Sequence, residues 1–416
     1  MVYIPALFFG TCFFNSIRKY GWNVEALLYL IFFVTGIASI LLDANNLYEY
    51  NCPKRPLGIA PFFYCFLLWA CIRPFGIRLR NNPINEVIIK NERILDYSVI
   101  FFFFIFIIVL YVSYSNISQI IVNSSLAQIR QDAYHGDNES FYNHLQGIPR
   151  YICALSTFFF ASSFFMLVVF FVNVLFRHKK WYFNLMALLG STPQLIAGIF
   201  QADRSQVVYW GVMFVVLFTF FYKSIRGGRL RSVLLYVLPV IAIGVVYLVA
   251  VTIARWGEGD SGAEGGTIRY LGMNYFNFCN FFNYFWNTPH SLCEIFPLTY
   301  KIFGVDYWTW GELVEKESGF YVYTFSTFLG YICSISGPVV MFVYCFFFNR
   351  ISNLFLKRKE KTTISFHELT KFWVVVLVPA CGFFCYHYSF FTTTIALIVW
   401  FMIARFSRIK FNRTFK

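Results

Sequence analysis

Eleven apolar segments recur along the chain, and each meets or nearly meets the length of about 20 residues that a bilayer-spanning helix needs. They cover residues 2–16, 26–42, 57–72, 97–116, 151–176, 181–200, 206–222, 232–254, 320–347, 372–386 and 389–405. The first ends before Arg18 and Lys19 without a small-residue cleavage site, so we expect an uncleaved span. The sequence therefore predicts an all-α polytopic membrane protein with about 11 transmembrane helices, forming one integral membrane domain over residues 1–416.

The composition excludes other classes of protein. Hydrophobic residues make up 58% of the chain and charged residues 13%, whereas soluble domains have about 45–50% and about 25%. This excludes a soluble enzyme and a nucleic-acid-binding domain. On a membrane protein, the net charge of +14 reports orientation in the bilayer rather than a polyanionic partner.

The basic residues concentrate in six connections, all on one side when the eleven spans alternate. These connections lie within residues 18–19, 73–93, 177–180, 223–231, 350–371 and 405–416. Because Lys and Arg in short loops mark the cytoplasmic side, we predict a multi-pass membrane protein with these connections in the cytoplasm. Its N-terminus would lie outside and its C-terminus in the cytoplasm.

Two long connections then lie on the outer, periplasmic side, at 117–150 and 255–319. Loops longer than about 12–15 residues are usually functional or disordered. The second loop is rich in Tyr, Phe and Trp, which argues against disorder. We expect it to form short amphipathic helices at the membrane interface and to carry the active site.

Several signatures are missing from the sequence. There is no Gly-rich phosphate loop, no zinc-type spacing and no acidic or basic residue in the middle of a predicted span. Interrupted helices, which are typical of secondary transporters, are not evident either. These features argue against an ATP-driven pump and an ion-coupled transporter, and they predict no metal and no cofactor. Cys279 and Cys293 could form a disulfide or remain two free thiols.

Three arginines at the predicted outer boundary could bind a diphosphate. Arg204 lies in the short turn between two spans, Arg255 closes the span that enters the large loop, and Arg269 follows in that loop. Arg binds phosphate in a bidentate manner and keeps its charge. The structural alternatives are a snorkelling Arg204 beside Asp203 and an Arg255 that serves as a helix-terminal cation.

Histidines and carboxylates on the same side could supply a general base. His290 in the large loop is the first candidate and His387 the second, because histidine titrates near neutral pH. The loop also carries Glu258 and other acids, which could bind sugar hydroxyls. For most of these acids a solvated loop is the plainer interpretation.

The chain resembles the Wzy-type O-antigen and capsule repeat-unit polymerases, which are related to the O-antigen ligases. Asp203-Arg204-Ser205 matches an outer-turn Arg of the family, and Ile253-Ala254-Arg255-Trp256 matches an Arg before the large loop. Gly266 follows Arg255 at the eleven-residue spacing of some members. Tyr321-Val322-Tyr323-Thr324 resembles an aromatic-Thr segment that family members carry after the large loop. Where the family often has an acidic residue, this chain has Ser334-Ile335-Ser336.

The resemblance implies metal-independent, inverting glycosyl transfer from an undecaprenyl-diphosphate-linked oligosaccharide. It assigns catalytic roles to His290, Arg255 and Arg204, and substrate binding to the residues Arg269, Glu258, Tyr323 and His387. The implied partners are the lipid bilayer of the bacterial inner membrane, a Wzz-type chain-length regulator and a Wzx-type flippase. An O-antigen ligase and a lipid-linked oligosaccharide flippase or other transporter are the alternatives.

Overall fold

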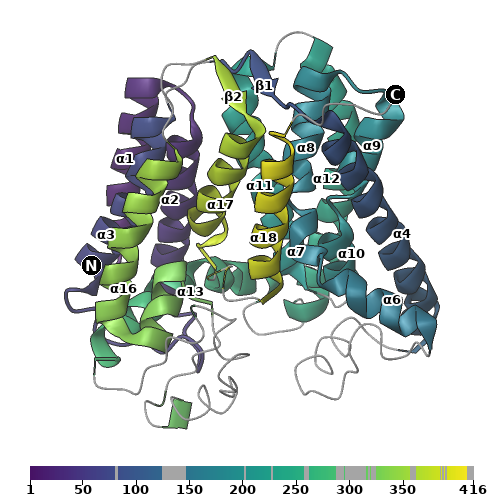
Figure 1. The fold of residues 1–416 in the computed structure, drawn as a ribbon. Helices are drawn as coiled ribbons and strands as arrows, with labels where there is room; N and C mark the ends of the chain where they lie inside the picture. The colour runs from purple at the N-terminus through teal and green to yellow at the C-terminus, as the bar shows by residue number, and fades with distance from the viewer. Residues whose placement is uncertain are drawn as a thin grey trace, which may run out of the picture. The chain divides into compact units, whose positions relative to one another are not determined.

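A computed structural model describes most of the chain (Figure 1). The described residues are 1–79, 83–123, 147–200, 203–225, 228–256, 262–286, 295, 315–316, 319, 325–356, 362–384, 386, 388 and 391–409. The helices are α1 Ile4–Tyr20, α2 Val24–Ala44, α3 Ala60–Arg78, α4 Glu92–Asn123, α6 Ile148–Thr157, α7 Phe160–Ser163, α8 Met166–Val172, the π-helical η1 Asn173–Arg177, α9 Trp181–Leu189, α10 Pro193–Phe200, α11 Arg204–Phe221, the 3-10 helix η2 Tyr222–Ser224, α12 Gly228–Trp256, α13 Gly262–Tyr284, α16 Phe328–Phe355, α17 Phe366–Cys381 and α18 Phe391–Phe406. Two short strands, β1 Glu86–Ile88 and β2 Thr363–Ser365, complete the described elements.

The helices are those of a multi-pass membrane protein. Seven stretches in the described part of the chain are long and apolar enough to cross a bilayer: Val24–Ala44, Ala60–Arg78, Glu92–Ser113, Phe160–Arg177, Arg204–Ser224, Leu230–Ile253 and Phe328–Phe355. The all-α membrane class is thus confirmed, whereas the count of eleven spans stays a prediction. The other four predicted spans are helical but shorter, in α1, in the α9–α10 pair, in α17 and in α18.

Three predicted spans are interrupted, contrary to expectation. The segment 181–200 divides into α9 and α10 around Gly190, Ser191 and Thr192, and Pro193 begins the second helix at a position that proline favours. The segment 151–176 divides into α6, α7, α8 and η1. In α16, Gly337 has a φ of 82°, which interrupts the helix before Pro338. The lack of visible interruptions therefore no longer argues against a transporter.

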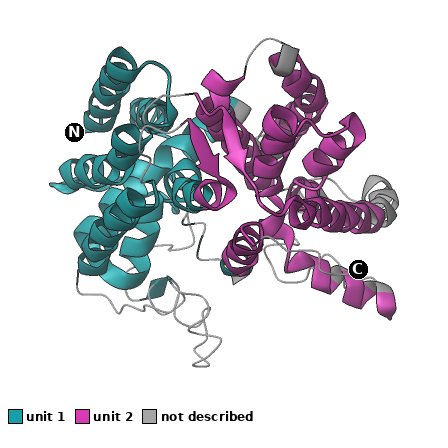
Figure 2. Cartoon of the chain, turned by 45° about the horizontal axis from the view of Figure 1, so that its top comes forward, with its two compact units in different colours: residues 1–81, 260–360, 371–394 teal, residues 82–259, 361–370, 395–416 magenta. Residues whose placement is uncertain are grey.

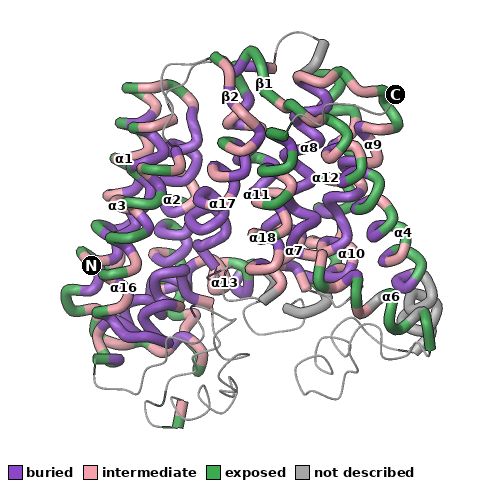
Figure 3. The backbone as a smooth tube through the Cα atoms, viewed as in Figure 1, coloured by how far each residue is buried: buried purple, intermediate pink, exposed green. Residues whose placement is uncertain are grey.

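The chain forms two compact units, each made of separate stretches of sequence (Figure 2). Unit 1 comprises Met1–Asn81, Asp260–Glu360 and Lys371–Thr394. Its centre is α13, which packs against α2, α3 and α16. All residues from 272 to 282 are buried (Figure 3). The large loop thus contributes a helix of 23 residues whose stretch 272–282 is buried, rather than only short amphipathic helices at the surface.

Unit 2 comprises Asn82–Gly259, Lys361–Thr370 and Ile395–Lys416. Its interior is the stretch Phe160–Arg177, of which 83% is buried, whereas only 17% of the most apolar part of α12 is buried. In a membrane, the exposed side of α12 would face lipid. β1 pairs in parallel with β2, with Val87 opposite Ile364.

Five of the predicted cytoplasmic connections come together in unit 2. β1 lies in the connection 73–93 and β2 in the connection 350–371, and their pairing joins these two connections. Ile84 donates its backbone N–H to Ser224 Oγ over 2.8 Å. Lys90 donates its N–H to the Ser407 carbonyl over 3.0 Å. Arg177 reaches the same region through Glu92. The contacts agree with placing all five on one side, and which side of the membrane this is stays a prediction.

Candidate functional site

Arg204 is the first residue of α11, and its side chain is buried to 7% exposure. The preceding Asp203 caps the helix: its carboxylate accepts hydrogen bonds from Ser205 N at 3.0 Å, from Ser205 Oγ at 2.7 Å and from Gln206 Nε2 at 3.2 Å. The cap fixes where the helix begins. It therefore also fixes where the guanidinium of Arg204 leaves the backbone.

The guanidinium points toward the end of α12. Arg204 Nη1 donates a hydrogen bond to Thr252 Oγ1 over 3.2 Å. α12 ends at Trp256, and Arg255 lies three residues after Thr252. Both predicted arginines therefore lie near the same end of α12. The side chain of Arg255 lies outside the described residues, and the roles of both arginines stay predictions.

Arg269 lies in unit 1 near the start of the buried part of α13. Its Nη1 forms an ion pair with Glu49 Oε1, which belongs to the predicted outer connection 43–56. Partial burial lowers the pKa of Arg269, but the ordinary value lies so far above neutrality that the guanidinium keeps its charge. The pair joins two connections that the charge pattern placed on the outer side.

Three asparagines on α13 add hydrogen bonds between this helix and neighbouring loops. Asn277 Nδ2 donates to the Phe325 carbonyl over 2.8 Å, and Asn280 Nδ2 donates to the Pro53 carbonyl over 3.1 Å. Asn283 Nδ2 donates to the Leu57 carbonyl over 2.9 Å. Buried polar groups need such partners. The spacing of three residues places these asparagines along one side of α13, where they hold residues 53–57 and Phe325 against the helix.

Four of the predicted site residues lie outside the described residues: His290, Glu258, Tyr323 and His387. The predicted general base and the predicted sugar contacts are therefore untested. Cys279 is a free, buried thiol in the structure, as the alternative of two free thiols expects, and Cys293 lies outside the described residues. Among the described residues, no group of three His, Cys, Asp or Glu side chains is placed to hold a metal ion.

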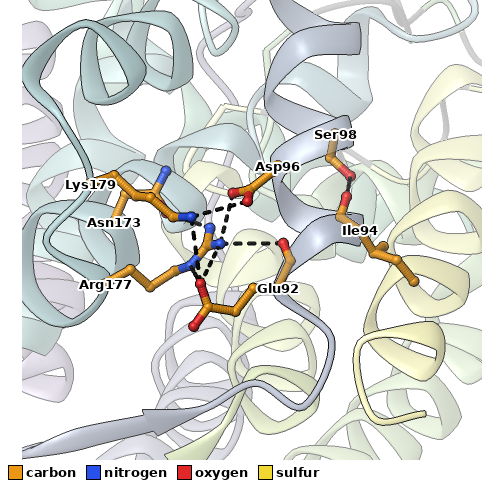
Figure 4. A network of polar contacts seen from close by, with 7 residues as sticks. All are labelled: Glu92, Ile94, Asp96, Ser98, Asn173, Arg177 and Lys179. Carbon is orange, nitrogen blue, oxygen red and sulfur yellow. Dashed lines mark hydrogen bonds and ion pairs between the residues drawn. The ribbon is translucent and has the colours of Figure 1, made fainter. Parts of the chain in front are cut away.

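A network of charges surrounds Arg177 at the end of unit 2 that holds the basic connections (Figure 4). The Arg177 side chain, only 3% exposed, lies 2.7 Å from Asp96 Oδ1 and 2.9 Å from Glu92 Oε2. Asn173 accepts a further bond from Nη1 over 2.8 Å, and Lys179 pairs with Asp96 over 3.0 Å. The network has two acids and two bases, so its formal charge is balanced. We assign it a structural role in fixing α4 to η1.

Sequence analysis missed one buried acid, Glu25, which lies just before the predicted span 26–42. The structure includes it in α2, at 7% exposure, as a lining residue of a cavity of about 290 Å³. The signal was present: Asn23 is a typical N-cap residue, and it accepts from Ala26 N over 3.0 Å. A cap there starts the helix before the acid.

Comparisons of the chain with known protein families, with curated proteins and with solved structures found no match. The function proposed below therefore rests on the residues and their geometry.

Proposed function

We propose that the chain polymerises undecaprenyl-diphosphate-linked oligosaccharide repeat units on the periplasmic face of the bacterial inner membrane, with its N-terminus outside and its C-terminus inside. The observation that supports this most is the buried Arg204, oriented by Thr252 toward the end of the helix that carries Arg255. A guanidinium at the end of a membrane helix can bind a phosphate group through paired hydrogen bonds. A lipid-linked diphosphate, whose phosphates lie at the membrane boundary, offers such groups.

The proposed reaction is a single displacement. The acceptor hydroxyl oxygen attacks the anomeric carbon of the donor glycan, and the bond from that carbon to the diphosphate oxygen breaks. The electron pair leaves with the undecaprenyl diphosphate, and the hydroxyl proton passes to a base, His290 in the first instance and His387 or a loop carboxylate otherwise. Attack opposite the leaving group inverts the anomeric centre.

The arginines would act on the leaving group. Negative charge grows on the diphosphate as the bond breaks, and preorganised cations stabilise such charge most where water is excluded. Arg204 and Arg255 would contact the diphosphate, and Arg269 is proposed to bind substrate as well. Glu258 and Tyr323 would hold sugar hydroxyls and faces. Binding two lipid carriers side by side would add a proximity effect.

The test is the glycan ladder of cells that carry single variants. Arg204→Ala and Arg255→Ala should leave only single repeat units on the final acceptor, with unchanged amounts of protein in the membrane. Arg18→Ala, an exposed arginine on α1, is the matched control and should leave the ladder intact. Normal ladders in both site variants would refute the diphosphate clamp.

The same experiment separates the ligase alternative. Loss of a ligase leaves polymer on undecaprenyl diphosphate, whereas loss of a polymerase leaves single units on the acceptor. The partners proposed for the polymerase are a Wzx-type flippase, which supplies repeat units, and a Wzz-type chain-length regulator.

A lipid-linked oligosaccharide transporter is the second candidate, because the α9–α10 pair and α16 are interrupted as transporter helices often are. Loss of a transporter would trap repeat units in the inner leaflet, where periplasmic glycosidases cannot reach them. Loss of a polymerase would leave them accessible in the outer leaflet.

A further inference from the structure

The cavity beside Glu25 lies in unit 1, between the end of α1, the start of α2 and the end of α3. Its lining residues are Cys12, Asn15, Ser16, Lys19, Tyr20, Glu25, Tyr29, Trp69, Arg73 and Ile77. Its volume of about 290 Å³ is at the lower end of the range for ligand sites. It is thus suited to a small head group rather than to an oligosaccharide.

The floor of the cavity is built around the Glu25 carboxylate. Ser16 Oγ donates to Oε2 over 2.9 Å, and the Tyr29 hydroxyl donates to Oε1 over 3.4 Å. Asn23 Nδ2 in turn donates to Ser16 Oγ over 3.2 Å. A Cβ atom at position 76 would come within 1.9 Å of Oε2, so only glycine leaves room for the carboxylate.

No cation in the described part of the chain lies within ion-pair distance of the carboxylate, although Lys19 and Arg73 act on it electrostatically from farther away. Its hydrogen-bond donors are the two hydroxyls, and none of the ion pairs in that part of the chain includes it. Burying a charge is unfavourable, and cations at a distance compensate for it less than a cation in direct contact. A carboxylate can accept about four hydrogen bonds. The floor therefore has both the charge and the acceptor sites to bind an ammonium group.

The rim carries the opposite charge. Lys19 and Arg73 are exposed lining residues, and the Arg73 guanidinium lies 4.6 Å from the centre of the Trp69 ring. Lys19 Nζ lies 5.1 Å from the centre of the Tyr20 ring. Trp and Tyr favour the membrane–water boundary, and basic pockets between membrane helices bind lipid head groups. The rim is thus suited to a phosphate at that boundary.

We propose that this cavity binds the head group of a phosphatidylethanolamine, with the ammonium on Glu25 and the phosphate between Lys19 and Arg73. The charges match in sign and order: a buried anion for the ammonium, and two outer cations beside the phosphate that connects it to the lipid. An anionic glycerol head group would place no positive charge on the carboxylate. A choline head group has no N–H to donate.

The test is lipid retention by the purified full-length protein, measured by native mass spectrometry in mixtures of equal amounts. The wild type should retain phosphatidylethanolamine over phosphatidylglycerol and phosphatidylcholine by roughly tenfold, because a charged hydrogen bond is lost with either competitor. Successive methylation of the ammonium should lower retention stepwise. Labelling of Cys12 by a maleimide, followed by peptide mass spectrometry, should slow when the lipid is bound.

Variants separate the two ends of the head group. Glu25→Gln should remove the preference for phosphatidylethanolamine over phosphatidylglycerol, and Lys19→Gln with Arg73→Gln should lower the retention of both phosphatidylethanolamine and phosphatidylglycerol. Arg18→Gln, the exposed neighbour outside the cavity lining, should change neither. If Glu25→Gln does not fold, the methylation series on the wild type still tests whether the ammonium binds the Glu25 carboxylate.

Three results would overturn the proposal. Preferential retention of phosphatidylglycerol that Glu25→Gln leaves unchanged would show a simple anion site. Equal retention across the methylation series would show that the ammonium does not reach Glu25. Displacement of the lipid by soluble O-phosphoethanolamine at similar concentration would show a site for a free phosphate ester.

Discussion

Ser39 in α2 donates its hydroxyl hydrogen to the backbone carbonyl of Gly272 in α13, with 2.9 Å between Oγ and O. The two residues are 233 positions apart in the sequence. The bond requires the backbones of the two helices to lie close together. Close packing of this kind depends on the missing side chain of glycine.

The first prediction concerns that contact. A Cβ at Gly272 would lie 2.6 Å from the Ala38 carbonyl oxygen, so Gly272→Ala should destabilise the protein by about 1–3 kcal/mol through overpacking. Gly211→Ala in α11 is the matched control, since no heavy atom lies within 4 Å of its added Cβ. Thermal unfolding in detergent would measure both. An unchanged midpoint for Gly272→Ala would mean that the helices can separate without cost.

The second prediction concerns the orientation of Arg204. Thr252→Val removes the hydroxyl that accepts from Nη1 at 3.2 Å, whereas Thr252→Ser keeps it. A lost hydrogen bond to a charged group costs about 1.5–3 kcal/mol, so we expect markedly shorter polymer from Thr252→Val and near-normal polymer from Thr252→Ser. Glycan ladders at matched protein levels would show the difference. Equal ladders would contradict a positioning role for Thr252.

The third prediction concerns the network around Arg177. Its side chain is 3% exposed and lies between Asp96 and Glu92. Arg177→Gln should lower the free energy of unfolding by about 1.5–3 kcal/mol, because it removes hydrogen bonds between charged groups while Lys179 still pairs with both acids. Lys179→Gln is the control: its side chain is 27% exposed, and we expect a loss of about 0–1 kcal/mol. Similar losses for both would show that the network acts only at the surface.

The fourth prediction concerns Cys52, in the connection between α2 and α3. Burial raises the pKa of the Cys52 thiol to about 12. Because the thiolate is the reactive form, Cys52 should resist maleimide at pH 7 to 9 until the protein unfolds. An unfolded thiol titrates near about 8.5. Between that pH and about 12 the unfolded chain loses its proton first, so stability should fall as pH rises.

Peptide mass spectrometry after a labelling time course would check the fourth prediction, with Cys52 in the denaturant-unfolded protein as the reactive reference. Rapid labelling of Cys52 in the folded protein would contradict its burial. The pH dependence of unfolding, measured in wild type and in Cys52→Ala, should differ only above about pH 8.5.

The membrane class followed from the sequence because hydropathy reports transfer into lipid directly. The grouping of the basic connections followed for a similar reason, since charge marks one side of the bilayer. The buried position of α13 could not be predicted from the sequence. Its aromatic and asparagine residues resemble a surface helix, and burial depends on partners in α2 and α16 that no local pattern reveals.

The candidate site was predictable only in part. Arg204 was identified because it lies in a short polar turn, and its contact with Thr252 was not, because threonine in an apolar helix gives no signal. Glu25 was missed because a hydropathy window ends where a charge begins. The N-cap at Asn23 starts α2 before Glu25, and Gly76, which has no side chain, leaves space for the carboxylate between the helices.

The pairing of β1 with β2 constrains the order in which the protein can assemble. β1 leaves the ribosome early, yet its partner is residue segment 363–365, which is synthesised near the end. Unit 1 likewise waits for residues 371–394 and unit 2 for residues 395–416. During synthesis the early helices must therefore remain in the membrane before the segments that pack against them have been made. A chain shortened at its C-terminus would leave both units unfinished, and not only the last helix.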